Sequence, residues 1–236
     1  MGLSAWLPSR CAICRGWPTA PVCELCIAHY AQPLPRCQRC ALPLPSGKVC
    51  GACLKQPPPL DLCLCATAYS WPWIDLITQL KFHAQPGWAA PLATLMRSSD
   101  GVEDTLDAAD WVLPIPLSRE RLSERGYNQS WLLARHLCPP KAQSQLLLRT
   151  RDTPSQRTLP RSERLSNLEG AFDVDPLLAH QLQGKRVVLV DDVMTSGASL
   201  HTAARVLRQA GARHIVAVVL ARTEAQTEAD LDTLPF

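Results

Sequence analysis

The sequence lacks any hydrophobic run that approaches the ~20 apolar residues a membrane-spanning helix requires. Its first residues do not combine a basic segment with a following apolar one, so we expect no signal peptide. Position 6 is Trp6, where a myristoylation motif requires serine or threonine. We therefore expect a cytoplasmic protein without a transmembrane segment.

An excess of charge of one sign is also missing. The 24 lysines and arginines against 21 acidic residues leave a formal net charge of +3, which is too small to indicate nucleic acid binding by itself. Hydrophobic residues make up 47% of the chain and charged residues 19%, so a normal core can be buried. The length of 236 residues suits one medium domain and a smaller appended one.

Cysteine, in contrast, is abundant, with eleven residues. A reducing compartment disfavours disulfides, and an odd number fits a closed disulfide framework poorly. Eight of the eleven form four CxxC pairs, whose two-residue spacer lets both sulfurs face one ion at about 2.3 Å. We predict two structural Zn²⁺ sites in which consecutive pairs share an ion: Cys11, Cys14, Cys23 and Cys26 at the first, and Cys37, Cys40, Cys50 and Cys53 at the second.

The spacing does not exclude an interleaved pairing of the four CxxC pairs. Because all the ligands are cysteine, the sites are closed and should fold the module rather than activate water. Three further cysteines lack this spacing and are interpreted as buried small hydrophobic residues: Cys63, Cys65 and Cys138.

A proline-rich connector, Gln56 to Pro59, separates two regions of different character. The first shows no sustained helical or strand period, and we predict a double zinc-ribbon module over residues 1–58. In the second, apolar strands alternate with amphipathic helices, which predicts an α/β domain with a parallel sheet over residues 59–236. Its expected strands lie at 66–71, 111–115, 185–192 and 215–220, and its helices at 73–82, 88–97, 129–137 and 200–210.

The strongest motif of the second region joins an apolar strand to a helix through two carboxylates and a loop of small residues. Loop amides and the positive end of a helix dipole form an anion site, and the hydroxyls of Thr195, Ser196 and Ser199 add donors. Asp191 and Asp192 lie at the carboxyl end of the strand, where open α/β sheets bind ligands. A ligand with a phosphate beside a ribose diol would satisfy both halves. An acidic pair that merely caps the helix is the alternative interpretation.

Two polar segments between the expected strands are rich in arginine, whose planar guanidinium suits pyrophosphate or a nucleic-acid backbone. A solvated surface would have the same composition. The candidate anion or DNA contacts are Arg119, Arg121, Arg125, Arg149, Arg157, Arg161 and Arg164.

The loop after the strand resembles the signature of type I phosphoribosyltransferases, which bind phosphoribosyl pyrophosphate. By that resemblance Asp191 and Asp192 hold the ribose hydroxyls, and the loop holds the 5′-phosphate through Thr195, Ser196, Gly197, Ala198 and Ser199. Further motifs make nearly the whole chain similar to the ComF late-competence family: the CxxC pairs, Leu80-Lys81-Phe82, Arg125-Gly126-Tyr127-Asn128-Gln129, Arg164-x-x-Asn167 and Gly170-Ala171-Phe172.

The resemblance implies a type I phosphoribosyltransferase-like sheet with helices on both faces. It also implies phosphoribosyl pyrophosphate as ligand, together with Mg²⁺, and a role in natural competence. There the protein would handle incoming single-stranded DNA beside a DNA-translocation partner. The alternative is an enzyme that transfers phosphoribose to a nitrogen acceptor, and a third possibility is a regulator that senses the sugar phosphate. We identify no residues in the sequence that would recognise a base.

Overall fold

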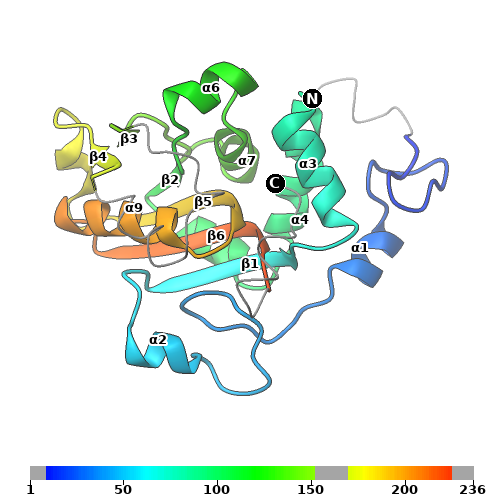
Figure 1. Ribbon diagram of the computed structural model, residues 1–236, viewed down its shortest axis with the longest axis horizontal. Coiled ribbons are helices and arrows are strands. Elements are labelled where there is room, and N and C mark those ends of the chain that lie inside the picture. Colours follow the sequence, from blue (N-terminus) through cyan, green and yellow to red (C-terminus); the bar gives the residue numbers. More distant parts are fainter. Residues whose placement is uncertain (1–8, 152–169, 225–236) are drawn as a thin grey trace.

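The computed structural model describes residues 9–151 and 170–224, whose longest strands form a four-stranded parallel sheet (Figure 1). The strands follow the order β1-β6-β5-β2, so the two longest strands lie at the centre. Their bounds are β1 Leu62–Ala68, β2 Trp111–Pro114, β5 Arg186–Met194 and β6 His214–Arg222. A separate antiparallel pair, β3 (Leu147–Arg149) and β4 (Phe172–Val174), flanks the second arginine-rich segment.

Helices cover both faces of the sheet, as expected. The side chains of β5 alternate between two hydrophobic cores: Leu189 packs with α9 (Ala198–Gln209), and Val188 and Val190 pack with α4 (Ala89–Arg97), α5 (Val102–Ala108) and α7 (Gln129–Leu137). Because both faces are buried, the strands consist of almost continuous apolar residues. The remaining helical elements are α1 Glu24–Tyr30, α2 Gly51–Lys55, α3 Trp73–Phe82, η2 Pro86–Trp88, α6 Arg119–Arg125 and η4 Ala179–Leu182.

Most of the predicted elements occur within a few residues of their expected bounds. The helix predicted at 73–82 is α3, and the one predicted at 129–137 is α7. The strand expected at 66–71 is displaced, because β1 begins at Leu62 and pairs with β6 through Cys63 and Cys65. The loop expected after β2 contains a short helix, α6, which begins at Arg119 and is capped by the side chain of Ser118. Cys63 is fully buried as predicted, whereas Cys65 and Cys138 are only half-buried.

The two cysteine-rich segments pack against different parts of the α/β fold. The first joins the core formed by α3 and α4, and the Trp73 indole donates to the carbonyl of Tyr30 at 2.9 Å. The second lies along the edge strand β1, where the Cys63 N–H donates to the carbonyl of Gln38 at 2.8 Å. Figure 1 accordingly shows α1 beside α3 and α2 beside β1. The predicted boundary at residues 58 and 59 therefore separates segments that share hydrophobic cores.

Among the helices of residues 9–151 and 170–224, none combines the length and the apolar character that crossing a bilayer requires.

Candidate functional site

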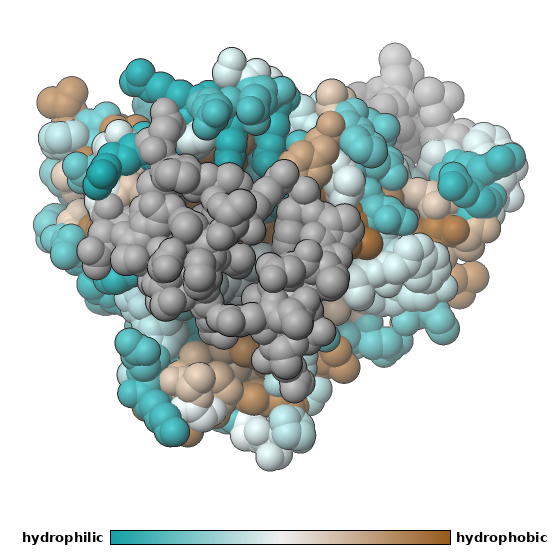
Figure 2. Space-filling view, viewed as in Figure 1, coloured by the Kyte–Doolittle hydropathy of each residue, from teal (hydrophilic) through white to brown (hydrophobic). Residues whose placement is uncertain are grey.

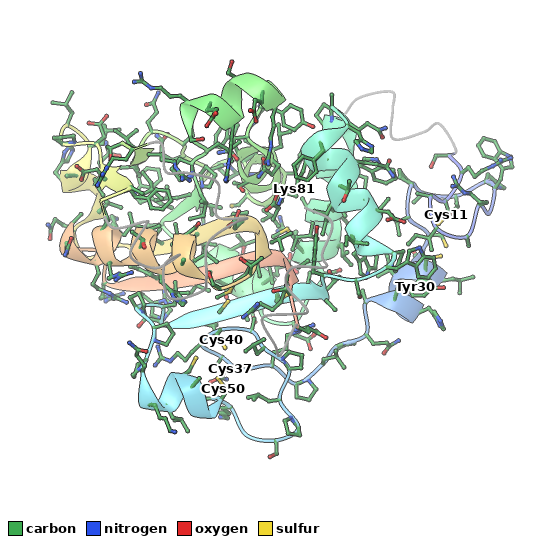
Figure 3. The ribbon with its side chains drawn as sticks, in the orientation of Figure 1. Cys11, Tyr30, Cys37, Cys40, Cys50 and Lys81 are labelled. Carbon is green, nitrogen blue, oxygen red and sulfur yellow. The ribbon has the colours of Figure 1, made fainter. Side chains whose placement is uncertain are left out.

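The eight cysteines of the CxxC pairs form two clusters in the sequential pairing. Within each cluster the four Sγ atoms lie within 4.8 Å of one another, and Figure 3 labels three members of the second cluster. The Sγ atoms of Cys11 and Cys26 are 3.8 Å apart, and those of Cys40 and Cys50 are 3.7 Å apart. Four sulfurs placed at about 2.3 Å around one Zn²⁺ would be separated by about 3.8 Å. Both clusters therefore fit structural zinc, and the interleaved pairing does not occur.

The electrostatics of the clusters are compatible with a bound cation. Burial opposes ionisation of Cys11 and Cys37, but N–H donors from the backbone, above all those of Cys23 and Cys50, lower their pKa to about 6 and about 7. Burial raises the pKa of Cys26 to about 12. A divalent cation is needed to hold all four sulfurs of a cluster as thiolates. All eleven cysteines lie within the described residues, and none of them is joined in a disulfide.

The loop between β5 and α9 begins directly after Met194. Gly197 adopts the left-handed conformation, with φ +81°, and is the residue that precedes the first turn of α9. A Cβ at this position would lie 2.5 Å from the Met194 methyl group and 3.0 Å from the His201 ring. Glycine is thus required by the loop itself, before any ligand is considered. The amides of the following helical turn and the dipole of this twelve-residue helix suit an anion.

The acidic pair at the end of β5 turns toward two different helices. The Ser130 hydroxyl, at the start of α7, donates to Asp191 Oδ1 at 2.9 Å. Lys81, at the end of α3, places its Nζ 3.3 Å from both carboxylate oxygens of Asp192. Asp192 is only 3% exposed, so this ion pair is shielded from water. The two carboxylates therefore have different surroundings although they are adjacent in sequence.

Burial raises the pKa of Asp191 to about 7, and the negative charge of Asp192 adds to this effect, while Lys81 opposes it. Near neutral pH the carboxyl group of Asp191 is consequently divided between its protonated and ionised forms. Such a group can accept hydrogen bonds from nearby hydroxyls in its ionised form and donate to them in its protonated form. Strongly shifted carboxyls at the carboxyl end of a parallel sheet are typical of functional sites.

Two residues of this site, Lys81 and Ser130, were not identified as site residues from the sequence. Lys81 lies within the motif Leu80-Lys81-Phe82, and Ser130 directly follows the motif that ends at Gln129. Both motifs carried the family resemblance, and this was the signal in the sequence that could have identified the two residues. Those motifs also arrange the helices: the Tyr127 hydroxyl donates to the carbonyl of Leu80 at 2.5 Å. Asn128 caps α7 by accepting from the Ser130 N–H at 2.9 Å and donates to the carbonyl of Ile115 at 3.0 Å.

The predicted arginines do not form a single group in the described part of the chain. Arg119, Arg121 and Arg125 belong to α6, which follows β2 and so lies near the carboxyl edge of the sheet, and Figure 2 shows hydrophilic side chains over this helix. The Arg125 guanidinium lies 4.9 Å from the centre of the Phe82 ring. Arg149 instead lies over Phe172, at 5.4 Å. The other three candidates, Arg157, Arg161 and Arg164, fall outside the described residues.

Metal analysis of the purified protein should give two zinc ions per chain. Cys11→Ser should lower this number to about one, because three thiolates and a hydroxyl hold zinc poorly, and should unfold the first ribbon. Cys138→Ser, which alters a cysteine outside both clusters, should retain both ions. A wild-type content near one would contradict the two-site assignment.

The raised pKa of Asp191 should make this residue destabilising at alkaline pH. Its folded pKa of about 7 exceeds its ordinary value of 3.8, so the folded state loses stability as the pH rises between these values. Asp191→Asn should therefore stabilise the protein, and by about 1 kcal/mol more at pH 8 than at pH 6. Denaturant unfolding at both pH values, with zinc content verified, measures this difference.

The matched control for this measurement is Asp104→Asn, which alters an exposed aspartate on α5. Its effect on stability should be small and the same at both pH values. An Asp191→Asn effect that does not change with pH would show that the carboxyl group is ionised throughout this range.

Comparison with known proteins agrees with this combination of zinc clusters and α/β sheet. The family model "Double zinc ribbon domain" matches residues 2–54, and the model "Phosphoribosyl transferase domain" matches residues 144–234.

Two of the similar proteins align with most of the chain, and a third aligns with less than half of it. The chain is 33% identical to "DNA utilization protein YhgH" of Salmonella typhimurium, over 92% of this chain and 98% of that protein. It is 32% identical to "Competence protein F" of Haemophilus influenzae, over 90% of this chain and 96% of that protein. A shorter match, 39% identical over 100 residues, covers 42% of this chain and 39% of "Competence protein ComFC" of Bacillus subtilis. The chain therefore belongs to the ComF family.

Proposed function

We propose that this protein binds phosphoribosyl pyrophosphate at the carboxyl end of β5 and acts in natural competence, in the uptake and handling of single-stranded DNA in the cytoplasm. The observation that carries the ligand is the acidic pair near the end of β5, followed five residues after Asp192 by the left-handed Gly197 and then by the start of α9. The competence role is supported by the names of two relatives as competence proteins and of a third as a DNA utilization protein.

The two halves of the site match the two halves of the ligand. The 5′-phosphate would accept hydrogen bonds from the amides of residues 195–199 and from the hydroxyls of Thr195, Ser196 and Ser199. The ribose diol would donate to Asp191, whose carboxylate is held by Ser130. Asp192 would contribute through its ion pair with Lys81, which keeps a cation within reach of the pyrophosphate. Mg²⁺ would accompany the pyrophosphate, as it commonly does with substrate phosphates.

Substitution of Asp191 tests the ligand. Asp191→Asn preserves size and the acceptor for Ser130 but removes the charge, and a lost charged hydrogen bond should weaken phosphoribosyl pyrophosphate binding about tenfold to a hundredfold. Thr195→Val, which removes one hydroxyl, should have a smaller effect, and the exposed Asp104→Asn none. Titration calorimetry with Mg²⁺ present measures all four proteins. Equal affinity for wild type and Asp191→Asn would place the ligand elsewhere.

The second candidate function is a phosphoribosyltransferase enzyme, which the match to a phosphoribosyl transferase domain supports. The same samples distinguish this enzyme from a protein that only binds the ligand. A binder should leave phosphoribosyl pyrophosphate intact when purine and pyrimidine bases are added. Steady release of pyrophosphate with one base would instead identify a phosphoribosyltransferase and its acceptor.

We further propose that α6, near the carboxyl edge of the sheet, contributes to a single-stranded DNA surface. The zinc ribbons and the second arginine-rich segment are the other candidates for this surface, and residues 152–169 of that segment lie outside the described residues. Arg119→Ala with Arg121→Ala should weaken binding of an oligonucleotide. The slope of log affinity against log salt should become shallower by about 0.7 for each phosphate that the variant no longer neutralises. Fluorescence anisotropy over a salt series measures both quantities.

A matched control removes two charges at the opposite edge of the sheet. Lys185 and Arg213 lie at the amino ends of β5 and β6, and Lys185→Ala with Arg213→Ala should leave the slope unchanged. Equal effects of the two double variants would indicate a general charge effect without a defined surface. Binding that does not respond to salt would contradict the DNA surface.

A further inference from the structure

One buried arginine, Arg222, connects the second zinc cluster to the strand that carries the acidic pair. It is the last residue of β6 and is 4% exposed. Its Nε donates to the carbonyl of Cys40 at 2.9 Å, and its Nη1 donates to the carbonyl of Met194 at 3.0 Å. The same nitrogen also donates to the carbonyl of Thr223 at 2.7 Å. The planar guanidinium thus joins two distant backbone segments, those of Cys40 and Met194, to the end of its own strand.

Each end of this bridge has a defined role. Cys40 is a member of the second cluster, and Figure 3 shows it with Cys37 and Cys50 between β1 and α2. Met194 is the last residue of β5, directly before the loop of residues 195–197. The Met194 methyl group lies against Gly197, at 2.5 Å from the position that a Cβ would take. Arg222 therefore fixes the residue on which the candidate phosphate loop rests.

Neighbouring contacts reinforce the same connection. The Met194 sulfur lies 3.6 Å from the Sγ atom of Cys63, and the N–H of Cys63 donates to the carbonyl of Gln38 in the second ribbon. Arg36 of this ribbon forms an ion pair of 3.0 Å with Glu224, just after β6. The first cluster differs, because its cysteines pack in the other hydrophobic core, and Figure 3 shows Cys11 well away from the labelled cysteines of the second.

The geometry makes the bridge specific for arginine. A lysine keeps the positive charge but has a single ammonium group, which cannot reproduce the two separate nitrogens that contact Cys40 and Met194. The Met194 carbonyl would keep a second donor, the N–H of Thr223 at 3.1 Å, whereas the Cys40 carbonyl would lose the Arg222 donor, which is costly for a buried group. The second ribbon and the end of β5 would then no longer be held together by one side chain. A shift at Met194 would move the loop, and a shift at Cys40 would disturb the zinc ligands.

We propose that Arg222 is a positioning residue through which the second zinc cluster holds the candidate phosphate loop in its binding conformation. The part of this inference that concerns phosphoribosyl pyrophosphate rests on the proposed function. Coupling of this kind is reciprocal, so metal in the second cluster strengthens ligand binding and the ligand strengthens metal retention there to the same extent.

The ligand-free test is hydrogen exchange of the full-length, zinc-loaded protein. Arg222→Lys should speed exchange about tenfold, the equivalent of one lost charged hydrogen bond, in peptides covering residues 194–200 and 37–41 together. Peptides covering residues 23–30 of the first ribbon should be unchanged. The control is Arg208→Lys, since Arg208 donates to the carbonyl of Arg213 and pairs with Asp61 at the amino edge of the sheet. Unchanged exchange in residues 194–200, or faster exchange throughout the protein, would overturn the proposal.

The ligand-bound test uses protein substituted with ¹¹³Cd, whose two cysteine clusters give separate resonances. Cys14→Ser, which alters an exposed ligand of the first cluster, assigns them. Phosphoribosyl pyrophosphate with Mg²⁺ should shift the resonance of the second cluster and slow its metal release to a chelator, and Arg222→Lys should abolish both effects and weaken binding about tenfold.

These outcomes separate the two proposals. If calorimetry shows that the ligand binds wild-type protein while the second-cluster resonance and its metal release stay unchanged, the coupling through Arg222 is refuted and the proposed ligand stands. If the ligand does not bind wild-type protein, the proposed function fails, and hydrogen exchange alone decides whether Arg222 positions the loop.

Discussion

The parallel pairing of β5 with β6 determines where the functional groups of this protein lie. The register sets Asp191 opposite Val219 and Met194 opposite Arg222, so the acidic pair, the loop and the buried guanidinium all gather at one end of two adjacent strands. Both strands are covered on two faces, and a shift in register would exchange the residues that face the two cores. The packing of the core therefore also fixes the positions of the site residues, although these come from widely separated parts of the chain.

Both cysteine clusters are also part of these cores. Cys37, Cys40 and Cys53 are buried with Leu60 and Cys63 on the α9 side of the sheet, and other cysteines pack with α3 on the opposite side. Small zinc ribbons bury little apolar surface of their own and depend on the metal for their fold. Here the ribbons also cover parts of the sheet, and loss of metal would expose apolar surface of the α/β fold.

Local patterns in the sequence were sufficient for much of this architecture. The apolar run before Asp191 predicts β5, the spacing of Leu200, Ala203, Ala204 and Leu207 predicts α9, and the CxxC spacing predicts both clusters. Short elements such as α5 and α6 were missed because seven residues provide too little periodicity. The position of β1 was misjudged because Cys63 and Cys65 alternate within the strand and were treated as isolated residues.

The contacts that complete the site could not be derived in this way. Lys81 lies 111 residues from Asp192 in sequence, and Arg222 lies 182 residues from Cys40. Such pairs depend on the order of strands in the sheet and on how the second ribbon packs along β1, neither of which has a local signature. A basic residue between two apolar ones, as Lys81 is between Leu80 and Phe82, does not identify its partner.

The intermediate ionisation of Asp191 has a consequence for any ligand at this end of the sheet. A carboxyl group with a pKa near 7 carries a fraction of a proton at neutral pH, and that fraction changes whenever a charge approaches or leaves. Binding of a polyanion would draw part of a proton from the buffer, whereas binding of a metal ion would release part of one. The heat of association would then depend on the buffer, and the occupancy of the site would follow small changes in the acidity of the cell.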